Sequence, residues 1–321
     1  MRRRRRDRLR VSAVDLRVRV GDLELANPVV AASGTFGHGD EVARLCAPDR
    51  LGAVTVKSLA PFAWPGNPAP RLHPAPGGGM LNSVGLQGPG VEHWIAAELP
   101  ELRALGARVI ASIWGRTVAD FAVAAKMLEP AARELVAVEV NVSCPNVEDR
   151  SRVFAHAPES TAAAMRAVAD VNLGLPLLAK LSPNTFEIVD VAGAALEAGA
   201  TGLTLVNTLL GFGIDATGRR PVLGAGNGGL SGAPIKPVAL RAVHDVSRAY
   251  PGVPVIGTGG VTSGEDVVEM LLAGASAAGV GTVTFREPRA MLRILDELSA
   301  WCAEHGVTRV ADLTGALEEP R

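Results

Sequence analysis

Short apolar runs of strand length alternate along the chain with longer stretches in which apolar residues recur at helical spacing. A run such as VAVEVN (136–141) consists mainly of small, alternating apolar residues, which is typical of a core strand. Because strands and helices alternate almost without interruption, we expect a parallel sheet. The predicted strands span 28–33, 52–57, 108–113, 136–141, 176–181, 201–206, 253–258 and 276–281.

The predicted helices carry the start signals that helices need. Ser263 precedes two acidic residues, and Thr117 precedes Asp120, which is the pattern of an N-cap. Eight alternations of strand and helix predict a closed (β/α)8 TIM barrel. A doubly wound open sheet is the structural alternative, but no GxGxxG follows the first strand. The predicted helices span 39–47, 91–105, 117–134, 159–172, 184–198, 235–249, 264–273 and 287–304.

One long excursion interrupts the alternation after the second strand. Residues 58–90 are rich in proline and glycine and poor in strand patterns, and they exceed the length of an ordinary barrel loop. We therefore expect this insertion to be a functional element. No linker divides the chain, so 21–321 is predicted to form a single barrel domain. The arginine-rich start, within 1–20, is predicted to be a basic, flexible segment.

Composition narrows the classes of function that fit the chain. The 321 residues are 48% hydrophobic with a net charge of −1, which argues against binding to nucleic acid. No apolar run reaches 18 residues, so no membrane span is expected. The three cysteines form no CxxC pair, which is typical of a reducing cytoplasm and excludes an iron–sulfur cluster carried by this chain alone. We predict no metal site.

Polar residues gather where the predicted strands end. In a barrel the loops at the carboxyl ends of the strands converge on one mouth, so these residues should face one site. Lys57 and Lys180 each end an otherwise apolar strand, and two ammonium groups at one mouth indicate an anionic ligand. The other strand-end residues are Ser33, Ser112, Asn141, Asn207, Thr208, Gly259, Gly260, Gly281 and Thr282.

The last two strands are followed by glycines and hydroxyls, in GTGG (257–260) and VGT (280–282). Backbone N–H groups at a helix start bind phosphate, and the loops after the seventh and eighth strands are the usual phosphate site of a barrel. A phosphorylated ligand is therefore expected. This pattern fits sugar-phosphate isomerases and aldolases as well as flavin enzymes.

Cys144 follows the fourth predicted strand, between Ser143 and Pro145. A thiol has a reference pKa of about 8.5, within reach of neutral pH where its surroundings favour the thiolate. A thiol held in this way can transfer a proton. No histidine falls at a neighbouring strand end, so a Cys–His hydrolase dyad has little support. Cys46 and Cys302 are interpreted as buried hydrophobic residues.

An ordered set of motifs over about residues 20–300 resembles the class 1 dihydroorotate dehydrogenases, which are FMN enzymes of pyrimidine biosynthesis with a TIM-barrel fold. The resemblance implies that Cys144 is the base that removes the C5 proton of dihydroorotate while C6 gives hydride to FMN, yielding orotate. The motifs include NPVVAASGTFG (27–37), GMLNSVGLQGPG (79–90), NVSCPN (141–146), AKLSPN (179–184), GGLSGAPIKPVALR (228–241) and IGTGGV (256–261).

The resemblance also implies two overlapping sets of binding residues. The substrate set is Lys57, Asn82, Ser83, Val84, Gly85, Leu86, Asn141, Asn146, Asn207 and Thr208. The FMN set is Ser33, Lys57, Ser58, Ser112, Asn141, Lys180, Val206, Gly232, Gly259, Gly260, Gly281 and Thr282.

The motifs look most like those of the NAD-linked branch, class 1B. The resemblance then implies a homodimer of this chain and a separate FAD and iron–sulfur subunit, together a heterotetramer, that carries electrons from FMN to NAD. The sequence departs from the family at Gly88, at Ser112 and in the loop 146–160, where Arg150 and Ser151 replace glycines.

Two alternatives remain open. A dihydropyrimidine dehydrogenase-like flavin barrel would act on uracil or thymine, although such enzymes carry histidine where this chain has Asn146. A non-catalytic flavin- or phosphate-binding barrel would serve as a subunit, although binding alone needs no positioned thiol.

Overall fold

The computed structural model describes residues 14–143, 145–146 and 152–318. Eight parallel strands form a closed barrel in which the last strand pairs with the first, with Gly279 opposite Val30. Each strand lies within a range predicted from the sequence, so the predicted (β/α)8 barrel is confirmed. In barrel order the strands are β3 (Val29–Ala31), β4 (Ala53–Thr55), β7 (Val109–Ile113), β8 (Ala137–Asn141), β11 (Leu177–Leu181), β12 (Gly202–Leu205), β17 (Val255–Thr258) and β18 (Ala277–Val280).

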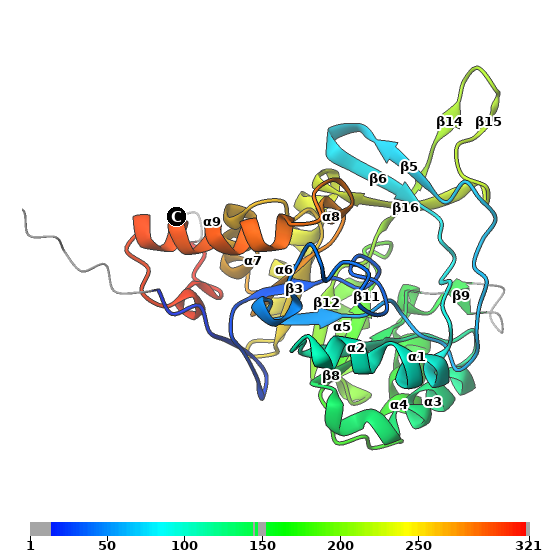
Figure 1. The fold of residues 1–321 in the computed structure, drawn as a ribbon, viewed down its shortest axis with the longest axis horizontal. Coiled ribbons are helices and arrows are strands. Elements are labelled where there is room, and N and C mark those ends of the chain that lie inside the picture. The colour runs from blue at the N-terminus through cyan, green and yellow to red at the C-terminus, as the bar shows by residue number, and fades with distance from the viewer. Residues whose placement is uncertain (1–13, 144, 147–151, 319–321) are drawn as a thin grey trace, which may run out of the picture.

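Helices pack against the outside of the barrel strands (Figure 1). The predicted caps are confirmed, because the hydroxyls of Thr117 and Ser263 accept hydrogen bonds from the N–H groups of Asp120 and Asp266, each at 3.2 Å. None of the helices in the described part of the chain is long and apolar enough to cross a membrane. The helices are α1 (Val91–Ala97), α2 (Leu99–Ala104), α3 (Val118–Met127), α4 (Pro158–Ala169), α5 (Ile188–Glu197), α6 (Lys236–Ala249), α7 (Gly264–Leu272), α8 (Val283–Arg286) and α9 (Ala290–Glu304).

Three helix predictions were wrong in detail. The helix predicted at 117–134 ends as an α-helix at Met127 and is followed by a 3₁₀ helix over Glu129–Glu134. The predicted helix at 39–47 is a series of turns, because Pro48 disfavours helical backbone just before it and the Glu41 carboxylate takes the N–H groups of His38 and Gly39. The single helix predicted at 91–105 divides at Glu98, where α2 begins with Pro100 in its first turn. Short 3₁₀ helices occur at Pro48–Arg50, Pro76–Gly78, Glu129–Glu134, Phe154–His156, Ala233–Ile235 and Val310–Leu313.

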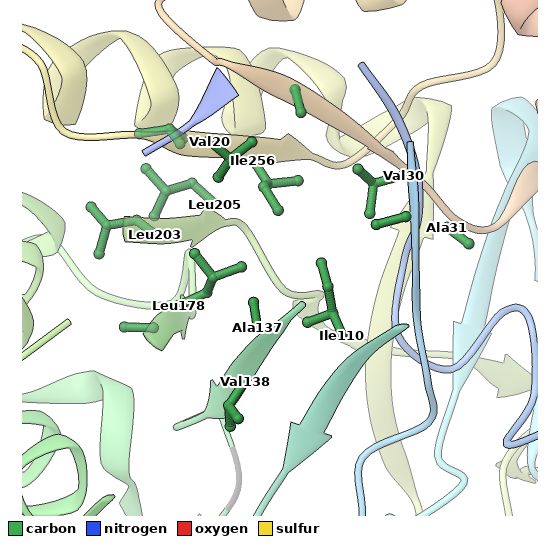
Figure 2. Close-up of a cluster of buried hydrophobic side chains, with 14 of the residues drawn as sticks. Val20, Val30, Ala31, Ile110, Ala137, Val138, Leu178, Leu203, Leu205 and Ile256 are labelled. Atoms are coloured by element: carbon green, nitrogen blue, oxygen red, sulfur yellow. The ribbon is translucent and has the colours of Figure 1, made fainter. Parts of the chain in front are cut away.

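Small aliphatic side chains fill the space within and around the barrel. Figure 2 shows Ala137, Leu178, Leu203 and Ile256 gathered from different strands into one buried cluster. Burial of apolar surface of this kind stabilises a fold by about 25 cal/mol per Å². Alanine and valine thus fill the small spaces inside the barrel, and the closed parallel topology brings the carboxyl ends of the strands to one mouth.

A four-stranded antiparallel sheet adds to the barrel, and the sequence pattern did not reveal it (Figure 1). The insertion 58–90 is not strand-poor, since it contributes β5 (Leu72–Ala75) and β6 (Gly79–Asn82). A second excursion contributes β13 (Leu209–Phe212) and β16 (Asn227–Gly232), so the expectation of a single insertion was wrong. Glycine-rich strands such as β16 resemble loops in sequence, and only pairing with distant segments makes them strands. The hairpin of β14 (Ile214–Asp215) and β15 (Arg220–Pro221) projects beyond this sheet.

Residues near the start of the described chain belong to the folded body. β1 (Val18–Val20) pairs with β2 (Leu23–Leu25), and Asp15 forms a parallel bridge with Arg309. The predicted flexible segment 1–20 is therefore wrong for residues 14–20, while residues 1–13 lie outside the described part. Pro145–Asn146 (β9) and Arg152–Val153 (β10) form a further short ladder.

Candidate active site

A cavity of about 380 Å³ opens at the carboxyl ends of the barrel strands. Nearly all of the described residues in the two predicted binding sets line it. Cys144 lies outside the described residues, and for Asn146 the backbone in β9 is described. The lining members of the sets are Ser33, Lys57, Ser58, Asn82, Ser83, Val84, Gly85, Leu86, Asn141, Lys180, Val206, Asn207, Thr208, Gly232, Gly259, Gly260, Gly281 and Thr282.

The barrel register explains why residues far apart in sequence meet at this cavity. Lys180 on β11 pairs with Asn141 on β8 and with Thr204 on β12. Side chains alternate between the two faces of a strand, so residues opposite one another in neighbouring strands share a face. For these strands that face is the barrel interior, which directs the polar strand-end residues toward the mouth.

Two lysines place positive charge in the cavity. Lys180 is buried, with 5% of its surface exposed, and its ammonium lies 3.8 Å from the carboxylate of Glu139. Burial, and secondarily the charge of Lys180, lowers the pKa of Lys57 to about 8. Removal from water and a nearby like charge both disfavour the protonated ammonium. The negative charge of a bound anion would stabilise both ammonium groups and offset the cost of burial and of their mutual repulsion, so the lysines favour an anion in this cavity.

The Asn141 amide belongs to a hydrogen-bonded chain that runs from the cavity into the barrel. Its Oδ1 accepts from Nδ2 of Asn207 at 3.4 Å, and its own Nδ2 donates to the Ser58 hydroxyl at 3.1 Å. The hydroxyls of Ser58 and Ser112 lie 2.9 Å apart. These contacts fix the orientation of the Asn141 amide, which can then discriminate donors from acceptors on a ligand.

Ser112 is the described member of the predicted sets that does not line the cavity. It is fully buried, at 0% exposure, and it lies behind Ser58. Its hydroxyl donates to Glu139 at 3.1 Å. A serine on β7 is too short to reach the cavity past Ser58, so Ser112 contacts the wall residues and not the space within.

Bare backbone lines the side of the cavity that follows β17. Gly260 has a φ of +80°, and a Cβ there would lie 2.5 Å from the Cβ of Lys236. Only glycine fits such a position, and it leaves backbone N–H groups free to approach a ligand. Gly259, Gly281 and Thr282 also line this side. This glycine-rich backbone, the two lysines and the cavity volume together fit a flavin that carries a phosphate.

The insertion 58–90 closes the opposite side of the cavity with a loop. Hydrogen bonds within the insertion hold this loop in place. Asn67 donates to the Ser83 hydroxyl at 2.9 Å, and its N–H donates to the carbonyl of Val84 at 3.0 Å. The indole of Trp64 donates to the carbonyl of Gly85 at 3.0 Å. These bonds give residues 82–86 a defined shape over the cavity.

Sequence reasoning missed several residues that the structure brings to this site. Asn67 and Leu72 line the cavity from the insertion, and Thr258 lines it from β17. Glu139 lies just behind it and contacts Lys180. The signal for Glu139 was present, because a carboxylate in the middle of an apolar strand needs a partner. Asn67 belongs to the family-like motif GNPAPR (66–71), but its place at the cavity depends on the folded insertion.

Comparison with known proteins gives one consistent result. The family model described as dihydroorotate dehydrogenase matches residues 15–301. Proteins named dihydroorotate dehydrogenase B (NAD(+)), catalytic subunit, are similar along nearly their whole length. The relative from Alkaliphilus metalliredigens is 43% identical over 96% of this chain and 100% of its own. The relative from Pelobacter propionicus is 46% identical over 95% and 99%.

A third relative of the same name, from Trichlorobacter lovleyi, is 45% identical over 94% of this chain and 98% of its own. The resemblance drawn from the motifs, to the NAD-linked branch in particular, is therefore confirmed. The family match spans the barrel and every described residue that lines the cavity. The chain belongs to the dihydroorotate dehydrogenase family.

Proposed function

We propose that this chain oxidises dihydroorotate to orotate in pyrimidine biosynthesis, with FMN as its cofactor. The observation that carries the proposal is the cavity at the barrel mouth, where two lysines, an amide chain and a bare glycine backbone face one another. The relatives carry the name of this activity.

FMN would lie along the β17 and β18 side of the cavity. Gly259, Gly260, Gly281 and Thr282 would hold its phosphate through backbone N–H groups and a hydroxyl. Bound there, FMN would supply a hydride acceptor. Lys180 would face the ring system and stabilise negative charge on it, and the neutral residues Ser33, Ser58, Val206 and Gly232 would complete the pocket.

Dihydroorotate would lie between the ring system and the loop 82–86. Its carboxylate would pair with Lys57, and the amides of Asn141 and Asn207 would bind the pyrimidine edges, with Asn146 completing the set. Asn82 to Leu86 and Thr208 would enclose the ring and exclude water. Cys144 would remove the proton from C5 as a general base.

Electrons would leave through a partner. The chain has no GxGxxG after its first strand and three cysteines in all. The relatives are named NAD(+)-linked catalytic subunits, which supports a separate subunit that carries FAD and an iron–sulfur cluster. A homodimer of this chain would form the centre of that assembly.

The visible spectrum of the purified protein tests this proposal. We expect a yellow protein that releases FMN on denaturation and is bleached when dihydroorotate is added without oxygen. Bleaching by dihydrouracil but not by dihydroorotate would indicate the dihydropyrimidine dehydrogenase-like alternative. A flavin that neither compound reduces would indicate a non-catalytic barrel.

A further inference from the structure

Glu139 is a buried carboxylate to which neither the motifs nor the proposed function assigns a role. It lies in the middle of β8, and 3% of its side chain is exposed. A charge removed from water is costly unless other charges and hydrogen bonds compensate it. Glu139 has three such partners. Its Oε1 accepts from Ser112 at 3.1 Å, its Oε2 accepts from Thr204 at 3.0 Å, and Lys180 lies 3.8 Å away.

These partners come from three strands, β7, β11 and β12, and Glu139 itself lies on β8 between β7 and β11. Ser112 lies opposite Glu139, and Lys180 lies opposite Thr204. Glu139 itself lies opposite Leu178, two residues before Lys180, so the carboxylate and the ammonium share the interior face of the barrel. The register of the barrel strands therefore places Glu139 beside its three partners.

Lys180 lines the cavity, whereas Glu139 lies behind it, deeper in the barrel. At 3.8 Å the two charges attract each other without a short hydrogen bond. The ammonium therefore keeps its N–H donors for a ligand, while the carboxylate behind it compensates its charge. Lys57 lines the same cavity, and burial, followed by the charge of Lys180, lowers its pKa.

We propose that Glu139 is a positioning residue that anchors Lys180 and sets the positive potential that this ammonium exerts on the bound flavin. The inference rests on the proposed function, because FMN is the group on which Lys180 would act. Lys180 favours the reduced, anionic flavin, so the negative charge of Glu139 moderates that preference. Loss of Glu139 and loss of Lys180 should then shift the flavin potential in opposite directions, which a purely structural residue would not do.

The test is a cycle of Glu139→Gln, Lys180→Met and the double variant. Glutamine keeps the size of the side chain and can still accept a hydrogen bond. We expect Glu139→Gln to raise the reduction potential of bound FMN, favouring reduced over oxidised flavin by on the order of tenfold. Lys180→Met should lower the potential. The double variant should match Lys180→Met alone, because a buried carboxylate without its lysine takes up a proton and leaves no charge for glutamine to remove.

Glu134→Gln is the matched control. Glu134 lies shortly before β8 in the sequence and forms an ion pair with Arg103 at 2.9 Å, and both side chains are partly exposed. The potential of this control should equal that of the parent. An unchanged potential in Glu139→Gln would overturn the inference. So would an equal shift in the presence and absence of Lys180.

Thermal unfolding of the flavin-free proteins separates this inference from the proposed function. Breaking a buried pair by removing one partner destabilises a protein more than removing both. We expect each single variant to lose thermal stability and the double variant to recover part of the loss. Additive losses would refute the Glu139–Lys180 pair. A parent protein that binds no FMN would instead refute the proposed function.

Discussion

The side-chain amide of Asn82 on β6 donates a hydrogen bond to the carbonyl of Gly229 on β16 at 3.2 Å, across 147 residues of sequence. This contact joins the two excursions that cover the barrel mouth. Both residues also line the cavity. The shape of the proposed substrate side of the cavity therefore depends on how closely the two excursions approach each other.

Replacement of Gly229 should disturb this side of the cavity. A Cβ at position 229 would overlap the side chain of Thr208, which lines the same space. A displacement of about 1 Å at a reacting centre can cost about 10²-fold in rate. We expect Gly229→Ala to lower kcat/KM for dihydroorotate by about that factor, measured by steady-state assay with a dye acceptor, while FMN content is retained.

Gly226→Ala is the matched control for that variant, because a Cβ at Gly226 would meet nothing within 4 Å. It should lower stability slightly through its positive φ and leave kcat/KM unchanged. Equal kinetic losses in both variants would show that the loop conformation, and not the contact with Thr208, determines the rate.

The proposed base is tested by Cys144→Ser. General bases contribute about 10²–10⁴-fold to rates, and an alkoxide is much harder to form than a thiolate. We expect the variant to keep FMN and to reduce it with dihydroorotate more slowly by about this factor at pH 7, measured by stopped-flow absorbance. Cys302→Ala, at a buried site on α9, should keep the parental rate. A serine variant that reduces its flavin at the parental rate would exclude Cys144 as the base.

The proposed flavin contact is tested by Lys180→Ala. Loss of the cation should remove most of the bound FMN or lower its reduction potential, because the ammonium favours the anionic reduced ring. The FMN content per chain and a redox titration measure the two effects. Lys126→Ala removes an exposed lysine from α3 and should change neither. Full occupancy with an unchanged potential in Lys180→Ala would place Lys180 away from the flavin.

Binding of an anionic ligand should weaken as the pH rises above 8. Burial and the charge of Lys180 hold the pKa of Lys57 at about 8, so the ammonium loses its proton above that pH and the ligand loses a cation. We expect the Kd of orotate, measured by flavin absorbance, to rise up to about tenfold per pH unit above 8. Lys57→Met should bind weakly with a flat profile across this range.

The lowered pKa of Lys57 also makes the stability of the folded protein depend on pH. Because the folded protein holds the Lys57 proton less tightly than the unfolded chain does, the unfolded state binds more protons between about pH 8 and 10.5. The contribution of Lys57 to the free energy of unfolding should therefore increase with pH over that window. Denaturant titrations of the parent protein and of Lys57→Met at pH 7.5 and 9.5 measure it. A larger gain with pH in the methionine variant would contradict this sign.

The route of electrons out of the protein is tested with the purified single chain. We expect it to reduce dyes or oxygen with dihydroorotate, and to reduce NAD only when an FAD and iron–sulfur partner is added. Steady NADH production by the chain alone would contradict the proposed exit route. Rapid turnover with fumarate alone would indicate the other class 1 branch.

The order of apolar and polar residues along the chain was sufficient to predict the barrel and much of the cavity wall. Each barrel strand was found because a buried parallel strand is a short apolar run, and this signal is local. Lys57, Asn141 and Lys180 were found because they end such runs, and the topology of a barrel brings strand ends together. Both signals depend on the order of neighbouring residues alone.

The pairing of distant segments and the contacts between buried charged and polar groups follow from the folded structure and not from local sequence. The glycine-rich β16 looked like a loop because its strand character comes from pairing with β6 and β13. Glu139 was missed although it is a charge in an apolar strand, and its partner follows only from the register between β8 and β11. Ser112 has the same sequence pattern as the other strand-end residues, but in the folded protein Ser58 lies between it and the cavity. These outcomes depend on contacts between residues remote in sequence, and no local pattern of hydrophobic and polar positions encodes such contacts.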